Sequence, residues 1–437
     1  MSLFEGQQVE LVIEKPASGG RMIARHLGQV VLVRGAIPGE RVRAWVERAE
    51  KRLAYAVTRE VVEASPDRRA DAADPLCGAA LYSHIAYHRQ LALKSDVIRD
   101  AFTRLGRYPI EQPIDVAGSP EQAYRMRARF HVRGAKAGFY REGTHQLCDA
   151  AATGQLRAAT LAAVERLASI LDRDARDTVM SITMTETISG DDRAAHLELA
   201  PRTRLEDATL EAAAVGAQLA GISAIDDTGG LRTVGLPFVS DPLSAITPTV
   251  GDGATLRRHA ASFFQGNRYL VPVLVSAVAE AVPDAGEVLD LYAGVGLFSV
   301  ALAALGHMEV TAVEGDRISG ADLRENARPH APRIDAQVAS VEAYVAARAG
   351  GGKASRRQSP ATVVVDPPRT GVSKEAAASI VRLAPSRIVY VSCDPATLAR
   401  DVRRLLDAGY RLDAIRAFDF FPNTPHVESL ATLTRNP

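Results

Sequence analysis

The stretch Asp290-Leu-Tyr-Ala-Gly294-Val-Gly296-Leu-Phe-Ser299 decides the fold of this chain. It continues an apolar run that is typical of a buried strand, and the apolar residues after it are typical of a helix. Glycines at 294 and 296 allow a sharp turn and a close approach of the backbone to a ligand. Ser299 stands where a dinucleotide-binding turn has Gly or Ala, so the match to that fingerprint is incomplete. The stretch alone predicts a strand, a ligand-binding turn and a helix.

Strand and helix patterns alternate through the chain from about residue 255 onward. Apolar runs end near Glu314, Asp366 and Cys393, each before a helical pattern, and a final pair of runs closes the sequence. This alternation predicts an α/β fold with a Rossmann-like, doubly wound and mainly parallel sheet. Ligands of such sheets bind at the carboxyl ends of the strands. At that edge Glu314 can accept both hydroxyls of a ribose, which nicotinamide and adenosylmethionine cofactors both offer.

Two later strand ends and one downstream segment carry side chains suited to catalysis. Asp366 stands before two prolines, which fix φ and make the turn rigid. Cys393 ends the next strand; a lone cysteine is usually a small core residue, but this one shares the expected ligand-binding edge. Glu428 follows in the last segment, where a single glutamate would ordinarily be a solvated surface residue. The three residues together predict a reactive edge of the sheet.

Two different units precede this α/β region. Residues 1–68 alternate apolar and polar positions in short runs broken by Gly and Pro, which predicts a small antiparallel β-barrel. Residues 69–254 have a mixed pattern that predicts a central α+β domain, and residues 255–437 form the third unit. Within the central domain, residues 88–106 predict an amphipathic helix. Its expected core positions are Leu91, Ile98, Phe102 and Leu105.

A basic segment at residues 121–142 interleaves six Lys or Arg residues with aromatic residues. Such a mixture suits phosphate contacts and base stacking, although a solvated strand face is an equally ordinary interpretation. Period-two spacing would place its alternating arginines on one strand face. These arginines are Arg125, Arg127 and Arg129, and the aromatic residues are Tyr124, Phe130, Phe139 and Tyr140.

Composition limits the classes of protein that remain. The 437 residues include 52 Lys or Arg and 52 Asp or Glu, so any binding of a polyanion depends on local patches. Three cysteines without a CxxC pair provide neither a disulfide framework nor a four-thiolate zinc site, and they favour a reducing cytoplasm. The N-terminus lacks the features of a signal peptide. Residues 291–308 are uncharged over 18 positions, but their glycines favour a strand, turn and helix over a membrane span.

With these features in place, the chain resembles the S-adenosylmethionine-dependent RNA 5-methyluridine methyltransferases that act on transfer and ribosomal RNA. The resemblance covers nearly the whole chain, and its motifs occur in the order and spacing of the family. The N-terminal sequence GQVVLVRGAIPGERV also resembles a TRAM domain, a small OB-like RNA-binding barrel. The motifs are SFFQGN around Gln265, DLYAGVGLFS, VVVDPPRTG, VYVSCDPATLARD and FPNTPHVESL.

The resemblance implies a role for each matched residue. Cys393 is the nucleophile that adds to carbon 6 of uracil, because carbon 5 alone is too weak a nucleophile to take the methyl group. Glu428 is the base that removes the proton from carbon 5. Asp366 lies between cofactor and uracil, and Gln265 contacts the cofactor or holds the uracil edge. Tyr292 and Glu314 are cofactor contacts, with Glu314 on the ribose.

Some members of the family bind an iron–sulfur cluster through four cysteines in the central region. Here Cys77 and Cys148 remain, while Asp71 and Ala80 align with the other two positions, so we expect no cluster. We also expect no metal site, although His84 and His88 lie near Cys77 in the sequence.

Other functions compete with uracil methylation of RNA. An RNA 5-methylcytosine methyltransferase would have a Pro-Cys pair on the strand that carries Asp366 here. An amino-group methyltransferase would leave Cys393 without a role, and a nicotinamide dehydrogenase is disfavoured by Ser299 and by the cysteine at the ligand-binding edge. An RNA-binding protein that has lost catalysis would lack Cys393, Glu428 or Asp366. We expect a substrate in 23S ribosomal RNA, with transfer RNA as the alternative. We expect a cytoplasmic monomer without membrane contact.

Overall fold

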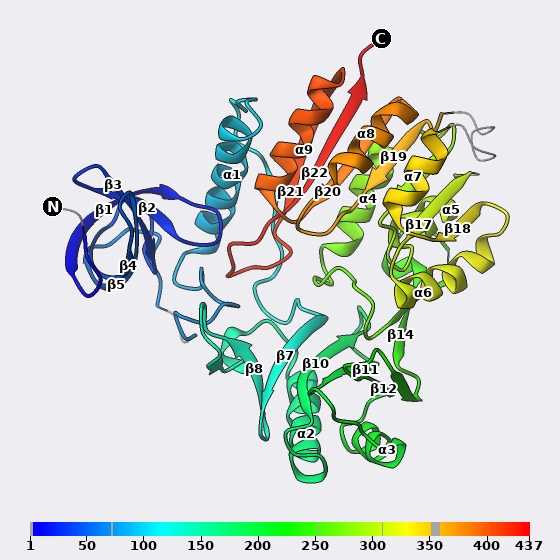
Figure 1. Cartoon of the computed structure of the whole chain (residues 1–437), viewed down its shortest axis with the longest axis horizontal. Helices are drawn as coiled ribbons and strands as arrows, with labels where there is room; N and C mark the ends of the chain where they lie inside the picture. The colour runs from blue at the N-terminus through cyan, green and yellow to red at the C-terminus, as the bar shows by residue number, and fades with distance from the viewer. Residues whose placement is uncertain (1–2, 71–72, 252, 308, 351–358) are drawn as a thin grey trace.

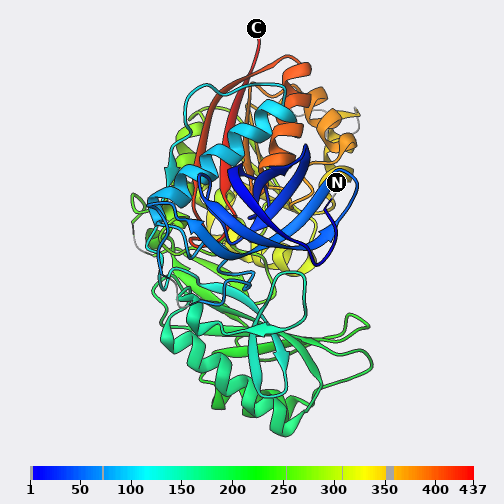
Figure 2. The ribbon, with the colours of Figure 1, turned by 90° about the vertical axis from the view of Figure 1, so that its left-hand side faces the viewer.

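The computed structural model describes residues 3–70, 73–251, 253–307, 309–350 and 359–437. It contains a closed barrel, a seven-stranded sheet, an eight-stranded sheet and a two-stranded sheet. The eight-stranded sheet and its helices lie at the top of Figure 1, the seven-stranded sheet lies below them, and the barrel lies to the left. In Figure 2 the barrel lies toward the viewer. The predicted α/β class with an N-terminal barrel is confirmed, whereas the division at residues 68 and 254 stays a proposal.

The N-terminal barrel closes in the strand order β1-β2-β3-β5-β4. Alternate side chains of β1 and β4 point into its core, as the period-two pattern requires. At one end, buried Glu40 accepts hydrogen bonds from the backbone of Ile37 and from Arg68, and this pairing fastens the last barrel residues. The strands are β1 Gln8–Pro16, β2 Met22–His26, β3 Gln29–Arg34, β4 Arg41–Ala49 and β5 Leu53–Glu63.

The central sheet has the strand order β13-β12-β11-β10-β7-β8-β9. Helices α2 and α3 pack on one face of it and lie on the side away from the eight-stranded sheet (Figure 1). The elements are β7 Arg127–Arg133, β8 Lys136–Tyr140, β9 Leu147–Cys148, α2 Ala158–Asp174, β10 Val179–Glu186, β11 Arg193–Leu199, α3 Asp207–Gly216, β12 Gly221–Ile225 and β13 Leu231–Gly235. Two strands, β14 Phe238–Pro242 and β15 Thr255–His259, then lead toward the eight-stranded sheet.

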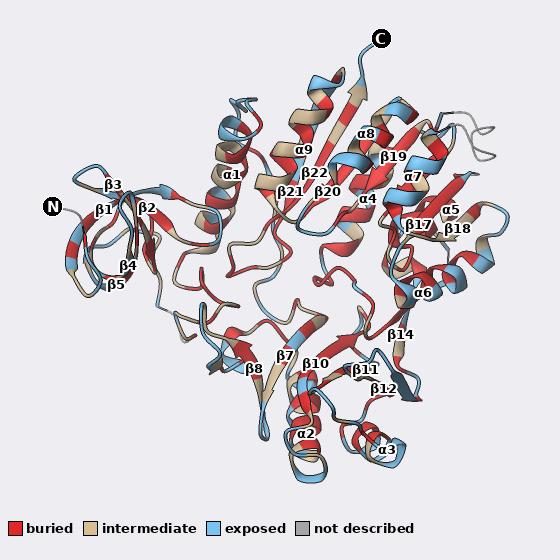
Figure 3. Ribbon diagram, viewed as in Figure 1, coloured by how far each residue is buried: buried red, intermediate tan, exposed pale blue. Residues whose placement is uncertain are grey.

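The eight-stranded sheet has the order β18-β17-β16-β19-β20-β22-β21-β6. The first five strands in this order, β18, β17, β16, β19 and β20, run parallel to one another. Strand β22 then pairs antiparallel with β20. Figure 3 shows the inner strands buried and the helices exposed on their outer faces. The strands are β16 Val288–Leu291, β17 Val310–Glu314, β18 Ile334–Val338, β19 Thr362–Val365, β20 Arg387–Ser392, β21 Tyr410–Phe418 and β22 Glu428–Arg435. The helices are α4 Val271–Ala281, α5 Leu297–Ala304, α6 Arg317–Ala327, α7 Val341–Ala349, α8 Lys374–Leu383 and α9 Pro395–Asp407.

Strand β18 is absent from the sequence-based expectation. Its residues are mostly half-buried, because β18 is an edge strand with one neighbour. A continuous apolar run marks the inner strands and is missing here, which explains the omission.

Helix α1, Tyr87–Arg104, confirms the predicted amphipathic helix, but it packs on the eight-stranded sheet. The following strand β6, Val116–Ala117, pairs with β21 at the edge of the same sheet. Ile98 and Phe102 are fully buried, as predicted. Leu105 was wrongly expected in the core: it follows the last helical turn and is 46% exposed.

The basic segment at residues 121–142 folds as β7, β8 and the residues before them. Arg127 and Arg129 share one face of β7, as predicted, whereas Arg125 precedes the strand. Three of the four aromatic residues are buried and are therefore not available for the base stacking that the mixture suggested. Phe130 and Phe139 stack on each other in the core with ring centroids 5.3 Å apart, and Tyr124 is fully buried. Tyr140 is half-buried on the polar face of the sheet.

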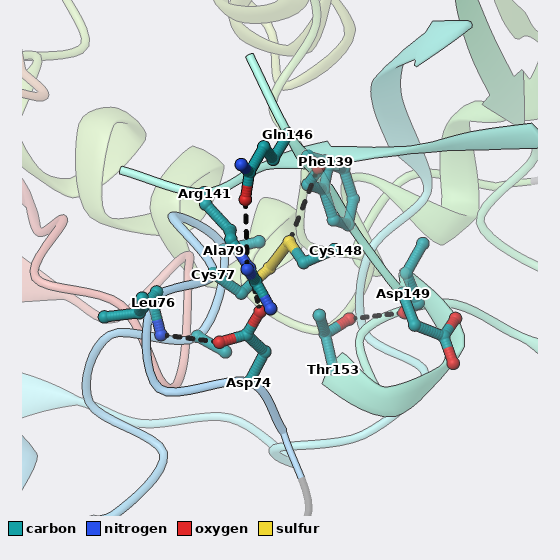
Figure 4. Close-up of a disulfide and its surroundings, with 12 residues drawn as sticks. Asp74, Leu76, Cys77, Ala79, Phe139, Arg141, Gln146, Cys148, Asp149 and Thr153 are labelled. Atoms are coloured by element: carbon teal, nitrogen blue, oxygen red, sulfur yellow. Dashed lines mark hydrogen bonds and ion pairs between the residues drawn. A yellow bond between two sulfur atoms is a disulfide. The ribbon is translucent and has the colours of Figure 1, made fainter. Parts of the chain in front are cut away.

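A disulfide joins Cys77 to Cys148 and corrects the expectation that the three cysteines provide no disulfide framework (Figure 4). It ties the segment after the barrel to β9 of the central sheet. The ion pair of Arg141 with Asp74 and the backbone bond from Gly78 to Tyr140 lie beside it. Sulfurs bonded to each other cannot serve as thiolate ligands of a metal. Ala80 is buried in the central core, and Asp71 lies outside the described residues.

We expect this disulfide to stabilise the folded protein by about 2–4 kcal/mol, because it closes a loop of 71 residues in the unfolded chain. Dithiothreitol should therefore lower the urea midpoint of the wild-type protein. The double variant Cys77→Ala, Cys148→Ala provides the control, since its midpoint should not respond to reductant. An unchanged wild-type midpoint, with a thiol count that proves reduction, would contradict the expectation.

Candidate active site

The turn after β16 has the backbone shape that the glycine pattern predicts. Gly294 and Gly296 have φ of 58° and 91°, in the left-handed region that favours glycine. A Cβ on Gly296 would lie 2.8 Å from the Leu323 side chain, so a larger residue cannot fit there without a shift. A Cβ on Gly294 would meet no atom within 4 Å, and the turn therefore borders open space. Tyr292 also has a left-handed φ of 60°.

Ser299 has a structural role that explains its departure from the dinucleotide-binding pattern. Its backbone N–H donates to the Asp290 carboxylate at 3.1 Å, and its hydroxyl donates to the same oxygen. Asp290 is fully buried, and burial raises its pKa to about 7, with a contribution from the nearby Asp366 carboxylate. The hydrogen bonds between Ser299 and Asp290 therefore join the first turn of α5 to β16, next to the glycine turn.

Glu314 at the end of β17 holds the top of the same turn. One of its carboxylate oxygens accepts a hydrogen bond from the Gly294 N–H at 2.7 Å, and the other accepts from the Asp316 N–H at 2.6 Å. The Tyr292 hydroxyl donates to Glu342 at 3.0 Å. Tyr292 and Glu314 therefore border the glycine turn. The ribose contact assigned to Glu314 stays a prediction.

Asp366 and Gln265 come together from distant parts of the chain. The Gln265 side-chain amide donates to the Asp366 carboxylate at 3.4 Å. Asp366 follows β19, and its N–H donates to the Leu291 carbonyl beside the glycine turn. Burial raises the pKa of Asp366 to about 7, and the Gln265 hydrogen bond opposes that shift.

Strand pairing brings Cys393 and Glu428 to the same point. Ser392 at the end of β20 pairs with Ser429 of the antiparallel strand β22. One step further along this register places Cys393 opposite Glu428. Because β22 is antiparallel, its first residue lies at the carboxyl edge of the parallel strands.

The charges around the Cys393 thiol favour its protonated form. Burial raises the pKa of this thiol to about 11, helped by the carboxylates of Glu428 and Asp366 and opposed by Arg369. Burial and the Asp366 carboxylate also raise the pKa of Glu428 well above its usual range. Glu428 is 4% exposed, and its Oε1 atom has no hydrogen-bond partner among the described residues. The site therefore has unused acceptor capacity, and a bound cation would favour the ionised forms of its carboxyl groups and of the thiol.

We expect Cys393, the one cysteine outside the disulfide, to react slowly with iodoacetamide at pH 8, with a rate that rises as pH approaches about 11. Glu428→Gln removes a carboxylate that raises the pKa of the thiol, so it should increase the thiolate fraction and the rate at pH 8. A pKa lower by one unit would increase the rate about tenfold. The rate is measured by mass spectrometry of the labelled peptide. Glu342→Gln is a matched control, and equal rates in all three proteins would contradict the expectation.

The loop before Glu428 is held by residues that the sequence analysis missed. Buried Lys94 of α1 forms an ion pair with buried Asp419 and donates to the Phe421 carbonyl at 3.2 Å. The Asn423 side-chain oxygen accepts hydrogen bonds from Gln90 at 2.9 Å and from Arg69 at 2.7 Å. Gln90 and Lys94 interrupt the apolar side of α1 at helical spacing. Polar residues in such positions were the available signal.

The barrel also contacts this loop. A Cβ on Gly20, in the turn between β1 and β2, would lie 3.0 Å from the Pro425 ring. The Tyr82 N–H donates to the Asn423 carbonyl at 2.9 Å. Parts of all three units therefore fix the segment that leads to Glu428.

The fold and the site define a class of enzyme. A glycine turn, an acidic residue at the next strand end and a C-terminal antiparallel strand belong to a Rossmann-like methyltransferase, and a thiol opposite a carboxylate suits covalent attack on a pyrimidine. The sequence profile of the tRNA (uracil-5-)-methyltransferases matches residues 86–436, and that of the TRAM domain matches residues 3–58. The chain belongs to the tRNA (uracil-5-)-methyltransferase family and is an S-adenosylmethionine-dependent RNA methyltransferase.

Individual relatives match over almost their whole length. An RNA methyltransferase of Streptomyces avermitilis is 33% identical, with 98% of each chain covered. The 23S rRNA (uracil(1939)-C(5))-methyltransferase of Alkalilimnicola ehrlichii is 32% identical, with 98% of this chain and 96% of that protein covered. The crystal structure of Pyrococcus abyssi tRNA (uracil-54, C5)-methyltransferase in complex with S-adenosyl-L-homocysteine superposes with a TM-score of 0.71 at 26% identity. That match covers 98% of this chain and 100% of the other.

The residues at the site fit S-adenosylmethionine. The glycine turn borders open space, and a sulfonium cation complements the excess of carboxylates around Cys393. No helix among the described residues has the length and apolar character to cross a bilayer.

Proposed function

We propose that this enzyme methylates carbon 5 of a uridine in 23S ribosomal RNA, with Cys393 as nucleophile and Glu428 as base. The observation that supports the proposal is the pairing of Ser392 with Ser429, because Cys393 and Glu428 are the next residues along this pairing and act on each other electrostatically, near Asp366 and Gln265. The relative from Alkalilimnicola ehrlichii, which acts on 23S ribosomal RNA, supports the choice of RNA.

Cys393 performs the first chemical step. Its thiolate adds to carbon 6 of uracil, and the electron pair of the 5,6 double bond moves toward carbon 5 and the carbonyl at carbon 4. Bound S-adenosylmethionine supplies an electrophilic methyl group on a positively charged sulfur. The sulfonium charge also favours the thiolate, because it offsets the carboxylates that raise the pKa of Cys393.

Glu428 completes the reaction after carbon 5 carries the methyl group. Its carboxylate takes the proton from carbon 5, the 5,6 double bond forms again, and the Cys393 sulfur leaves carbon 6 as thiolate. The raised pKa of Glu428 makes it a stronger base than an exposed glutamate. Asp366 and Gln265 orient the uracil or the cofactor by hydrogen bonds, and Tyr292 and Glu314 hold the cofactor beside the glycine turn.

The target base must leave its stack to reach this edge, which favours a uridine in a loop or bulge. The barrel and the basic face of β7 would contact the flanking phosphates, so RNA affinity should fall steeply with salt. A binding constant that does not depend on salt would contradict this role. We further propose that the enzyme acts as a monomer, since one chain carries every candidate site residue.

Deletion of the gene tests the substrate. We expect 5-methyluridine to disappear from one position of 23S ribosomal RNA, as mapped by mass spectrometry of each RNA class. Restoration by the wild-type gene and not by Cys393→Ala would complete the test. Loss from transfer RNA instead would replace the proposed substrate by the alternative.

A further inference from the structure

A cavity lies on the central sheet at the C-terminal end of β7, and its lining does not include Cys393. Its volume is about 520 Å³, which is within the range of sites for small organic molecules. Its lining comes from β7 and β8, from the end of α2 and the residues that follow it, and from the start of β10. Its polar lining consists of Arg129, His131, Arg133, Tyr140, His145, Asp172 and Asp177.

Aromatic rings are already stacked at this cavity. The rings of His131 and Tyr140 are parallel within 6°, with centroids 3.6 Å apart. His145 approaches Tyr140 edge-on with centroids 5.4 Å apart. His131 faces Ser181 on β10 and Gly138 on β8, and both neighbours are small. An additional flat ring can therefore continue the stack from the cavity.

Positive charge accompanies the stack. Arg129 lies two residues before His131 and forms an ion pair with Glu198. Arg133 lies two residues after His131, is exposed, and forms no ion pair within the described ranges. The carboxylates of Asp172 and Asp177 in the same lining repel a phosphate, so the phosphate of a bound nucleotide lies nearer to the arginines of β7.

Strand β7 connects this cavity to the active site. Met126, just before β7, donates its N–H to the Gly266 carbonyl at 2.9 Å, next to Gln265. The Arg127 guanidinium lies over the Phe263 ring, 5.7 Å from its centroid. His131 comes four residues later, which corresponds to roughly 13 Å along a strand. An RNA chain whose target base is at Cys393 can thus reach the cavity with a flanking nucleotide.

We propose that this cavity binds an unpaired nucleotide of the RNA substrate that flanks the target uridine, with its base stacked on His131 and Tyr140. The inference depends on the proposed function, because the flanking nucleotide is defined by the uridine that reacts with Cys393. Base stacking on aromatic rings tolerates any base, and Arg133 adds a phosphate contact. The cavity thereby sets the path of the RNA away from the active site.

A trapped complex tests this proposal. The probe is a stem–loop RNA around the uridine that loses its methyl group in the deletion strain, with 5-fluorouridine at that position. Fluorine cannot leave carbon 5 as a cation, so the RNA stays covalently attached to Cys393 after methyl transfer. A series of such RNAs carries one 2-aminopurine at successive flanking positions, and its fluorescence reports stacking.

We expect one flanking position to lose fluorescence in the complex and to regain it in the variant His131→Ala, Tyr140→Ala. Tyr140→Phe keeps the ring and should keep the quenching. The double alanine variant should raise KM about 10- to 100-fold with kcat changed less than twofold, because it weakens stacking and leaves Cys393 intact. Arg133→Gln should reduce the salt dependence of binding by about one phosphate contact, and Arg204→Gln, an exposed control in the same domain, should not.

The outcomes separate the two proposals. Failure of every RNA to form an adduct with Cys393 would overturn the proposed function, and this inference with it. Normal adduct formation with no quenched position, or with quenching that persists in His131→Ala, Tyr140→Ala, would overturn the inference alone.

Discussion

Cys393→Ala is expected to lower kcat by roughly four orders of magnitude or more, the largest loss of any single substitution in this enzyme. Carbon 5 of uracil becomes nucleophilic only after a thiolate has added to carbon 6, and no other described thiol is free to replace Cys393. Methyl transfer from radiolabelled S-adenosylmethionine to substrate RNA measures the loss. The 5-fluorouridine RNA should form a stable adduct with the wild-type enzyme and none with this variant.

Binding measurements separate a chemical defect from a folding defect. Cys393 is half-buried, and alanine fits its place, so RNA and S-adenosylhomocysteine affinities should stay within about twofold of wild type. Turnover by Cys393→Ala at more than a few per cent of the wild-type rate would remove the nucleophile assignment.

Glu428→Gln has the second largest expected effect, a loss of roughly 10²- to 10⁴-fold in kcat. Glutamine keeps the shape of the side chain but cannot take the proton from carbon 5. The enzyme should therefore stop after methyl transfer, with Cys393 still bound to carbon 6 of an ordinary uridine. Denaturing gel electrophoresis of enzyme with unmodified, radiolabelled RNA should reveal this adduct, which fast turnover prevents in the wild-type protein.

The reaction step at which each variant stops distinguishes the role of Glu428 from that of Asp366. Asp366→Asn should weaken cofactor or uracil binding without accumulation of a methylated adduct. Rapid turnover by Glu428→Gln, or an adduct that lacks the methyl group, would show that another group acts as the base.

Motif residues at strand ends were the predictable part of this molecule. Asp366 and Cys393 follow long apolar runs, and parallel strands bring their carboxyl ends to one edge, so local pattern sufficed to place them together. Glu428 required more, because its position depends on the antiparallel direction of β22, which no local pattern encodes.

The interactions that support Glu428 were beyond sequence reasoning for a related reason. Lys94 and Asp419 are 325 residues apart, and their pairing depends on how α1 docks against the last loop. For Leu105 and Phe139 the local pattern was misleading. Leu105 was expected in the core but is exposed after the end of α1, and Phe139 was a candidate for base stacking but packs against Phe130 in the core. The disulfide also reflects spatial proximity of two cysteines without a spacing signature.

The contact of Gly20 with Pro425 has a consequence for how such proteins can be recombined. An N-terminal barrel that served only to bind RNA could be exchanged between relatives without changes elsewhere in the chain. Here the β1–β2 hairpin of the barrel packs against Pro425, in the segment that leads to Glu428. A chimera must therefore take the hairpin and this segment from the same parent. Grafting the barrel alone should yield a protein that still captures RNA yet turns over poorly.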